Sequence, residues 1–279
     1  MLTLNYQKAI NAQYGHSDLS KKILAILEDK NFDTATFSQD ILTPIEELHL
    51  RGRKATIELA KAVGLNENIS VLDVGCGIGG PARTLAAEFG CHITGLDLSK
   101  EYCSAAEIIN NKLKFNKRIK IQQGNALHMP FNKAEFDVVF MQHVLMNIEN
   151  KERLFSQIKY VLCPKGRLAF YTICAGWNTP IYFPVIWANS PNINFLLTAP
   201  DLRQLISKSG FRELSWKDET KKILEGIQHA RNKPRSKNPI RFELISSIIG
   251  DVSTKWKNIV LNLKEERISV IQGIFEKNQ

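Results

Sequence analysis

One stretch of sequence decides the fold of this chain: Val71-Leu72-Asp73-Val74-Gly75-Cys76-Gly77-Ile78-Gly79-Gly80. An apolar run leads into a turn dense in glycine, and a helix-forming stretch follows at Ala82 to Glu88. The pattern predicts a buried strand joined to a helix N-terminus. Glycines permit positive φ and close backbone approach, and the first amides of a helix are unpaired, so such turns bind nucleotide-like ligands.

Two cofactor classes compete for this turn. Gly75, Gly77 and Gly80 also satisfy the dinucleotide pattern G-x-G-x-x-G, which is weak evidence by itself. A dinucleotide presents a pyrophosphate anion to the helix N-terminus, whereas S-adenosylmethionine has no phosphate and presents an ammonium and a sulfonium. An acid such as Asp73, two residues before Gly75, suits a cation. The residues therefore favour S-adenosylmethionine over NAD, and a turn without a ligand is disfavoured because clustered glycines cost folding entropy.

A second acid follows the next apolar run. His92 to Leu98 is typical of a buried strand, and Asp97 lies near its end. Its carboxylate could accept hydrogen bonds from both hydroxyls of a ribose, an arrangement that NAD enzymes also use. The structural alternative is a helix N-cap shared with Ser99. Asp97 thus indicates an adenosine-type ligand without distinguishing between the two cofactors.

Val71 to Arg83 and Gly95 to Leu98 resemble the first two cofactor motifs of the class I S-adenosylmethionine-dependent methyltransferases. Through Gly79-Gly80-Pro81-Ala82-Arg83, the chain is similar to their small-molecule branch, which contains sarcosine/dimethylglycine N-methyltransferases and ubiquinone/menaquinone C-methyltransferases. The resemblance to the superfamily covers Ser70 to Phe211. It implies the following cofactor contacts: Asp73, Gly75, Gly77 and Gly79 at the methionine and ribose moieties, Asp97 at the ribose hydroxyls, and further contacts from Leu98, Asn125, Ala126 and Gln142.

Two later motifs are expected at the carboxyl edge of the sheet, where ligands of such folds bind. In Gln123 to Leu127 the family has an acid that contacts the adenine amino group, and Asn125 stands in its place. Its side-chain carbonyl can still accept from an amine. In Met141 to Ile148 the related N-methyltransferases often have a histidine near the position of Asn147, so no general base is transferred to that residue. His143 is the available base, and a core or capping role is its alternative.

Three segments fall outside the core pattern and are expected to determine substrate identity. The first is an N-terminal helical cap, residues 1–60, in which Tyr14 could contact substrate and His49 and Arg51 could cover the cofactor. The second is an insertion at residues 175–200, whose aromatic residues either line a substrate pocket or pack on the sheet. The third is a helical insertion at residues 219–265, which could form a lid. The aromatic candidates for substrate contact are Trp177, Phe183 and Trp187.

The alternation of apolar strand-like runs with helical ones predicts an α/β fold. We expect a Rossmann-like, seven-stranded, mostly parallel sheet with helices on both faces, plus N-terminal and C-terminal helical cap segments. Strands are expected near Val71, Ile93, Ile121, Val138 and Leu168, and later at 211–217 and 268–276. Residues 61–279 are expected to form the methyltransferase domain, with the insertions at 175–200 and 219–265.

Composition limits the remaining possibilities. A chain of 279 residues, 44% hydrophobic, can bury one substantial core, and no stretch approaches the ~20 apolar residues of a membrane span. With no signal-peptide core either, a cytoplasmic location is expected.

Five cysteines without a C-x-x-C pair argue against a disulfide framework and against zinc, and no metal is expected. The net charge of +9 and the basic run Arg231 to Arg241 suggest RNA, but that run has no aromatic residues for base stacking, so a nucleic-acid partner is not expected.

The expected function is methyl transfer from S-adenosylmethionine to an N, O or C atom of a small molecule by in-line displacement. Such a reaction depends on alignment more than on a protein nucleophile. The alternatives are an RNA methyltransferase, an NAD-linked oxidoreductase and a noncatalytic cofactor-binding module. The acceptor, the atom methylated and the oligomeric state are left open by the sequence.

Overall fold

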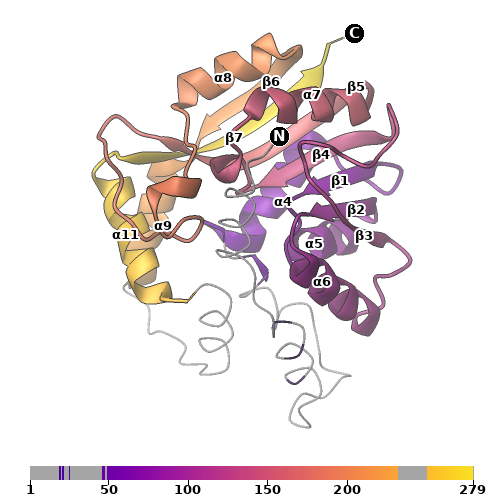
Figure 1. Ribbon diagram of the computed structural model, residues 1–279, viewed down its shortest axis with the longest axis horizontal. Coiled ribbons are helices and arrows are strands. Elements are labelled where there is room, and N and C mark those ends of the chain that lie inside the picture. The colour runs from indigo at the N-terminus through magenta and orange to yellow at the C-terminus, as the bar shows by residue number, and fades with distance from the viewer. Residues whose placement is uncertain are drawn as a thin grey trace.

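The computed structural model describes residues 49–231 and 250–278, together with residues 19, 21, 25, 46 and 47. The strands are β1 (Ser70–Val74), β2 (His92–Asp97), β3 (Ile119–Gln123), β4 (Phe136–Gln142), β5 (Leu162–Ala175), β6 (Phe211–Asp218) and β7 (Ile268–Lys277). They form one sheet in the order β3-β2-β1-β4-β5-β7-β6 (Figure 1). The pairs from β3 to β5 are parallel, and β7 is antiparallel to both of its neighbours. The strand order reverses at β1, so a ligand crevice is expected beyond the carboxyl ends of β1, β2 and β4.

Helices cover both faces of this sheet. They are α4 (Gly52–Val63), α5 (Gly80–Phe89), α6 (Lys100–Lys112), α7 (Lys151–Val161), α8 (Ala199–Lys208), α9 (Thr220–Arg231) and α11 (Val252–Lys264), with short 3-10 turns η1 (Leu145–Asn147) and η2 (Pro191–Ile193). One apolar cluster joins the sheet to α4, α5, α9 and α11, and a second cluster joins it to α7 and α8. The sequence-based prediction of a seven-stranded, mostly parallel Rossmann-like fold is confirmed.

Several of the described helices begin at a capping side chain, but α4 and α5 do not. Four helices have a polar N-cap residue whose side chain accepts a hydrogen bond from the backbone N–H three residues later. These residues are Ser99, Asn150, Thr198 and Asp251. The N-cap of α5 is Gly79, with φ 84° and no side chain to occupy the first amides. The first amides of α5 are therefore not capped by the side chain of the N-cap residue.

Two boundaries differ from the sequence-based expectation. Helix α5 begins at Gly80 rather than at Ala82, because Pro81 fits the first turn of a helix, where its missing N–H is not needed. Strand β5 begins at Leu162, before the expected position near Leu168, and it includes the run Pro164-Lys165-Gly166. That run forms a bulge: Leu162 pairs with Phe136, and the next pair is Arg167 with Val138.

The predicted cap segments are only partly described. Between β6 and β7 the chain forms α9 and α11, and the 175–200 insertion is tied to α11 because Asn262 accepts from the Tyr182 N–H at 2.8 Å and donates to its carbonyl at 3.0 Å. Of the predicted N-terminal helix the structure describes Leu19, Lys21 and Ala25, all of them helical. Tyr14 lies outside the described residues, as does nearly all of the basic run from Arg231 to Arg241.

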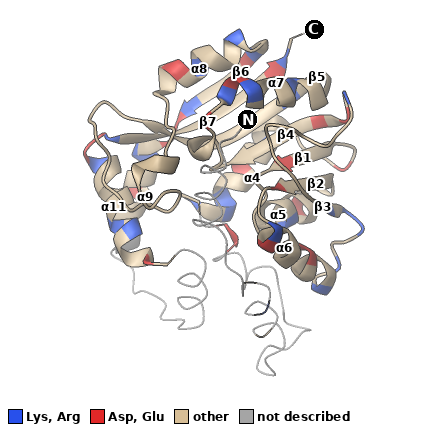
Figure 2. Ribbon diagram, viewed as in Figure 1, with Lys and Arg blue, Asp and Glu red and all other residues tan. Residues whose placement is uncertain are grey.

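Charged residues of both signs occur together on most elements. Helices α6 and α8 and strand β6 each have acidic and basic residues (Figure 2). The five cysteines are free thiols. Within the described part of the chain, no helix is long and apolar enough to cross a membrane. A search of the same residues finds no cluster of three His, Cys, Asp or Glu side chains placed to hold a metal ion.

Candidate active site

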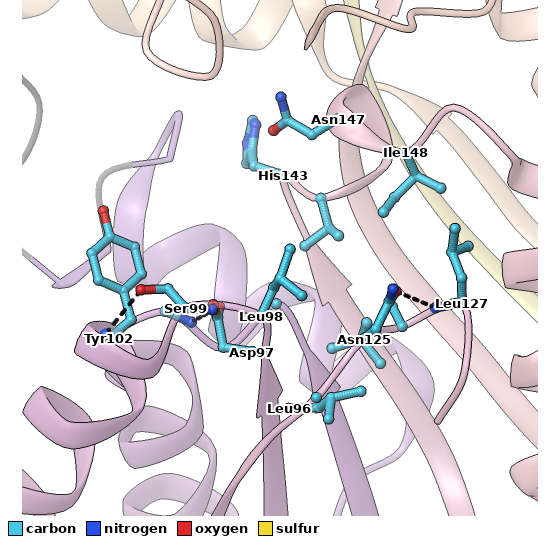
Figure 3. Close-up of a pocket in the computed structure, with 16 residues that line it drawn as sticks. Leu96, Asp97, Leu98, Ser99, Tyr102, Asn125, Leu127, His143, Asn147 and Ile148 are labelled. Atoms are coloured by element: carbon cyan, nitrogen blue, oxygen red, sulfur yellow. Dashed lines mark hydrogen bonds between the residues drawn. The ribbon is translucent and has the colours of Figure 1, made fainter. Parts of the chain in front are cut away.

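A pocket lies at the carboxyl ends of β1, β2 and β4, where the strand order reverses (Figure 3). Three stretches line it: the glycine turn after β1, the end of β2 with the start of α6, and the loops that follow β3 and β4. The lining residues include Gly75, Gly77, Leu96, Asp97, Leu98, Ser99, Tyr102, Asn125, Ala126, Leu127, His143 and Asn147. Six of the residues selected from the sequence as cofactor contacts thus lie together: Gly75, Gly77, Asp97, Leu98, Asn125 and Ala126.

Asp97 organises the floor of the pocket. Its Oδ2 accepts a hydrogen bond from the Gly77 N–H at 2.9 Å, and its Oδ1 accepts one from the Ser99 N–H at 2.9 Å. Ser99 in turn caps α6, so Asp97 and Ser99 share the helix start as the structural alternative predicted. A carboxylate has about four lone-pair sites, so two remain for a ligand. The carboxylate therefore orders the turn and still faces the pocket.

Asp73 is buried on β1, with 2% of its surface exposed, just behind the glycine turn. Its Oδ2 has no hydrogen-bond partner among the described residues. Burial, followed by the charges of Asp97 and Glu47, raises the pKa of Asp73 from 3.8 to about 7. A buried carboxyl oxygen without a partner, beside two further acids, is costly in the ionised form unless a cation compensates it.

The glycines of the turn leave room where a ligand would need it. Gly77 has φ 55°, and a Cβ added there would meet nothing within 4 Å, so the space in front of it is open. Gly75, with φ 74°, packs directly against the side chain of Val144. Gly79 packs against Arg83, whose Nη1 would lie 2.7 Å from an added Cβ. Gly75 and Gly79 thus serve close packing, whereas Gly77 keeps the pocket open.

Asn125 and Gln142 have partners that the sequence did not indicate. The Asn125 Oδ1 accepts from the Leu127 N–H at 2.9 Å, which shapes the loop after β3 (Figure 3). Gln142 does not line the pocket. Its Oε1 accepts from the Thr56 hydroxyl at 3.1 Å, and its Nε2 lies 3.3 Å from the His49 Nε2.

Residues just before α4 contact the first turns of α4 and α5. Glu46 pairs with Arg83, and both side chains are buried. Glu47 accepts from the Thr56 hydroxyl at 2.6 Å and from the Thr84 hydroxyl at 2.5 Å. Neither glutamate was selected as a site residue from the sequence. A charged pair of neighbouring residues is typical of a solvated surface, so no signal in the sequence indicated their burial.

His143 lines the pocket with φ 53°, directly after β4. Its Nε2 is buried and has no hydrogen-bond partner among the described residues. Burial and the nearby His49 ring hold the pKa of His143 well below its usual range, so the imidazole is neutral. The His49 ring stacks on it at 5.7 Å, and the Tyr171 ring meets its edge at 5.4 Å.

The three aromatic candidates of the 175–200 insertion lie in different environments, and none of them lines this pocket. Trp177 is 84% exposed, and Phe183 is half-buried against the core. Trp187 is buried in the core, and its indole donates to the Asn194 Oδ1 at 2.8 Å. Asn147 holds the insertion in place by donating to the carbonyls of Trp187 and Ile193, both at 2.9 Å.

Comparison with known proteins agrees with this geometry. Residues 72–170 match the family model described as "Methyltransferase domain". This part of the chain is thus similar to a methyltransferase domain, and it contains the two motifs that carried the resemblance in the sequence.

Individual relatives match over part of their length. A sterol 24-C-methyltransferase of Gibberella zeae is 35% identical over 113 residues, which is 40% of this chain and 30% of that protein. A glycine/sarcosine/dimethylglycine N-methyltransferase of Actinopolyspora halophila is 30% identical over 128 residues, which is 46% of this chain and 23% of that protein. The chain thus spans less than a third of the length of these two relatives.

The fold matches over the whole chain. A geranyl diphosphate C-methyltransferase of Streptomyces coelicolor A3(2), solved with Mg²⁺, geranyl-S-thiolodiphosphate and S-adenosyl-L-homocysteine, has a TM-score of 0.69 at 15% identity. The match covers 99% of each chain. At this level of identity the likeness concerns the fold alone.

Proposed function

We propose that this chain transfers the methyl group of S-adenosylmethionine to a small-molecule acceptor. The observation that carries the proposal is the buried Oδ2 of Asp73, which lacks a partner behind the glycine turn. The ammonium and sulfonium of S-adenosylmethionine would compensate this charge, whereas the pyrophosphate of a dinucleotide would add to the repulsion.

Each part of the cofactor has a counterpart in the pocket. Asp97 has lone pairs left for the two ribose hydroxyls. Leu98, Ala126 and Leu127 offer an apolar slot for adenine, with Asn125 at its polar edge. The open space before Gly77 would take the methionine portion. Gly75 and Gly79 support the turn, and Gln142 acts from behind the pocket by holding Thr56 and His49.

The reaction we propose is in-line displacement, in which bound S-adenosylmethionine supplies an electrophilic methyl group. The task of the protein is then to hold two reactants in line and to exclude water, which can supply roughly 7 to 11 kcal/mol. We propose that His143, whose Nε2 has no partner among the described residues, lies on the acceptor side of the pocket. As a neutral imidazole it can take the proton that an attacking group loses.

The acceptor is proposed as a small molecule because the relatives named above are, by their names, enzymes of sterols and of glycine derivatives. We propose that residues 1–60 and the insertions at 175–200 and 219–265 shape the acceptor side, with Tyr14, Trp177, Phe183 and Trp187 as the candidate contacts. The free thiols suit a reducing compartment, so a cytoplasmic location is part of the proposal.

Calorimetry tests the cofactor assignment. We expect S-adenosylmethionine to bind and NAD not to bind, and we expect Asp97→Ala to weaken S-adenosylmethionine binding at least tenfold. Unchanged affinity in that variant would contradict the ribose assignment. Incubation of the enzyme with methyl-labelled S-adenosylmethionine and a small-molecule extract of yeast then tests transfer. Label that appears only in added RNA, with a steep salt dependence, would favour RNA methylation instead.

A further inference from the structure

The turn that follows β4 has contacts with two parts of the molecule. Val144, Asn147 and Ile148 of this turn line the pocket, and Figure 3 shows Asn147 and Ile148 on its wall. The same turn is hydrogen-bonded to the 175–200 insertion, because the Phe195 N–H donates to the Met146 carbonyl at 2.8 Å. A ligand in the pocket would therefore touch the short turn on which the insertion is docked.

Asn147 connects the pocket directly to the insertion. It is 7% exposed, and its amide group donates to the carbonyls of Trp187 and Ile193, both at 2.9 Å. A side-chain amide has two N–H donors, so both are used by the insertion. Asn147 cannot donate to a ligand without releasing one of these carbonyls.

Lys151 makes a second connection, and it does so from outside the pocket lining. It is the first residue of α7 and is 4% exposed. Its ammonium group donates to the Ile148 carbonyl at 2.6 Å and to the Phe195 carbonyl. Burial lowers the pKa of Lys151 from 10.5 to about 8, so the ammonium form still predominates at neutral pH. A buried charge is costly, and the two carbonyls compensate part of that cost.

The turn itself is short and follows a strained residue. The 3-10 turn η1 has three residues, and His143 just before it has φ 53°, a left-handed conformation that is unfavourable for a residue other than glycine. Such a segment has little stability of its own, so its position depends on the contacts around it. On the pocket side Val144 packs against Gly75. The remaining contacts named above come from the insertion and from Lys151.

We propose that Asn147 and Lys151 are positioning residues that couple the pocket to the insertion, so that a bound cofactor holds residues 187–195 in place. We call their four hydrogen bonds the clamp. The inference rests on the proposed function, which supplies the identity of the cofactor. A cofactor that packs against Asn147 and Ile148 restricts the turn, and the turn carries the clamp. The coupling is reciprocal, so a variant that releases the insertion weakens cofactor binding by the same factor.

The clamp also predicts an order of binding. The 175–200 insertion is proposed above to shape the acceptor side, and the clamp holds it most firmly when the cofactor is bound. The acceptor then meets a completed site only after the cofactor has bound, as in enzymes whose first ligand assembles the site for the second.

The first test needs no substitution. Hydrogen–deuterium exchange of the protein is followed by mass spectrometry with and without S-adenosylhomocysteine. The reporters are the backbone N–H groups of Asn194 and Phe195, which donate to the carbonyls of Pro191 and Met146. We expect S-adenosylhomocysteine to slow their exchange about fivefold or more. Unchanged exchange at these amides, although S-adenosylhomocysteine binds in calorimetry, would overturn the coupling and leave the proposed function intact. A failure to bind S-adenosylhomocysteine would instead contradict the function itself.

The second test removes the clamp contact that lies outside the pocket. Lys151→Met has a side chain of similar length without a donor, and it changes no residue that lines the pocket. We expect it to abolish most of the slowing at Asn194 and Phe195 and to raise the Kd for S-adenosylhomocysteine about fivefold. Lys151→Arg, which keeps a charged donor, should restore both. The matched control is Lys208→Met, at an exposed lysine of α8, for which neither quantity should change.

The same variant separates positioning from a purely structural role. If Lys151 only stabilised the fold, Lys151→Met would lower the unfolding temperature but S-adenosylhomocysteine would slow the exchange of Asn194 and Phe195 as in the unsubstituted protein. That result would overturn the clamp. If the variant does not fold, the exchange experiment on the unsubstituted protein still decides the proposal.

Discussion

The guanidinium of Arg83 and the carboxylate of Glu46 form an ion pair in which both side chains are buried, at 0% and 1% exposed. Arg83 also donates to the Asn110 Oδ1 at 2.7 Å and to the Ile78 carbonyl at 2.6 Å. The pair joins the chain just before α4 to the first turn of α5, beside the glycine turn. Because charges at this depth are stable only when paired, the pair fixes the chain before α4 against the start of α5.

Replacement of one partner of this pair is expected to lower the unfolding free energy strongly, and replacement of the second partner is expected to add little further loss. Glu46→Met or Arg83→Met alone leaves an uncompensated buried charge, which costs about 3–5 kcal/mol of unfolding free energy. The double variant is expected to lose clearly less unfolding free energy than the two single variants lose together. Urea unfolding measures all three, and additive losses would contradict the coupling. The control is Arg203→Met at the exposed Arg203–Glu213 pair, for which a loss of at most ~1 kcal/mol is expected.

Alanine at two glycines of the same turn is expected to affect different properties, namely stability at Gly80 and S-adenosylmethionine binding at Gly77. At Gly80 an added Cβ would overlap the Glu46 Cβ and lie 2.9 Å from Glu46 backbone atoms, so Gly80→Ala displaces the chain at Glu46. We expect a loss of roughly 2–3 kcal/mol in stability. At Gly77 an added Cβ meets no protein atom, so Gly77→Ala costs only about 1 kcal/mol, for its positive φ. Its methyl group would instead occupy ligand space and weaken S-adenosylmethionine binding at least tenfold. Thermal unfolding and calorimetry of both variants test this contrast, which equal effects would contradict.

The core of this fold could be read from the sequence because each strand there is nearly continuous in apolar residues, as parallel strands buried on both faces are. Val71 to Val74 and Val138 to Met141 are examples, and both are buried in the structure. The cofactor pocket followed from the same reasoning, since the ends of adjacent parallel strands meet at one edge. Gly75, Gly77 and Asp97 were selected from the strand ends and Asn125 from the family resemblance, and all four line the pocket.

The surroundings of the pocket could not be read in the same way. Glu46, Glu47 and Thr56 are polar residues in a polar stretch, and their burial depends on how α4 docks on the sheet, which no local pattern encodes. Tyr171 and Gln272 lie inside apolar strands that pair across a hundred residues, so only the register of β5 with β7 brings them together. The same holds for the insertion, where the spacing of aromatic residues did not distinguish a core tryptophan from an exposed one.

The two tryptophans of the insertion give a direct test of that distinction. Trp187 packs in the core, and its backbone carbonyl accepts from Asn147, so Trp187→Ala is expected to cost about 3–5 kcal/mol of stability. Trp177 is 84% exposed, so Trp177→Ala is expected to change stability by less than ~0.5 kcal/mol. Chemical denaturation of the two variants compares them directly. A selective loss of methyl transfer in the Trp177 variant, with stability unchanged, would assign that residue to the acceptor after all.

The buried acid Asp73 makes the binding of S-adenosylmethionine dependent on pH. Its pKa in the free protein is about 7, and a bound cation favours the ionised form. Affinity is therefore expected to fall as pH decreases, by ~25-fold between pH 7.5 and pH 5.5 if only ionised Asp73 binds. At pH 6.5 binding should release most of one proton, which appears as a dependence of the calorimetric enthalpy on the buffer. Asp73→Asn should bind weakly at every pH and release no proton, whereas the control Asp201→Asn, at an exposed aspartate of α8, should behave like the unsubstituted protein.

The same carboxyl group is expected to destabilise the protein in the absence of cofactor. Its folded pKa lies above the ordinary value of 3.8, so the protonated form is the one that the fold favours. The stabilising contribution is fully present below pH 3.8 and is lost as pH rises through about 7. Asp73→Asn removes a buried charge at pH 8 and should raise the unfolding free energy there by roughly 2 kcal/mol or more, with a much smaller gain at pH 4. Urea unfolding at the two pH values measures both effects. A variant that is less stable than the unsubstituted protein at pH 8 would show that the carboxylate has a partner in the free protein, and the case for a cation site at Asp73 would then be lost.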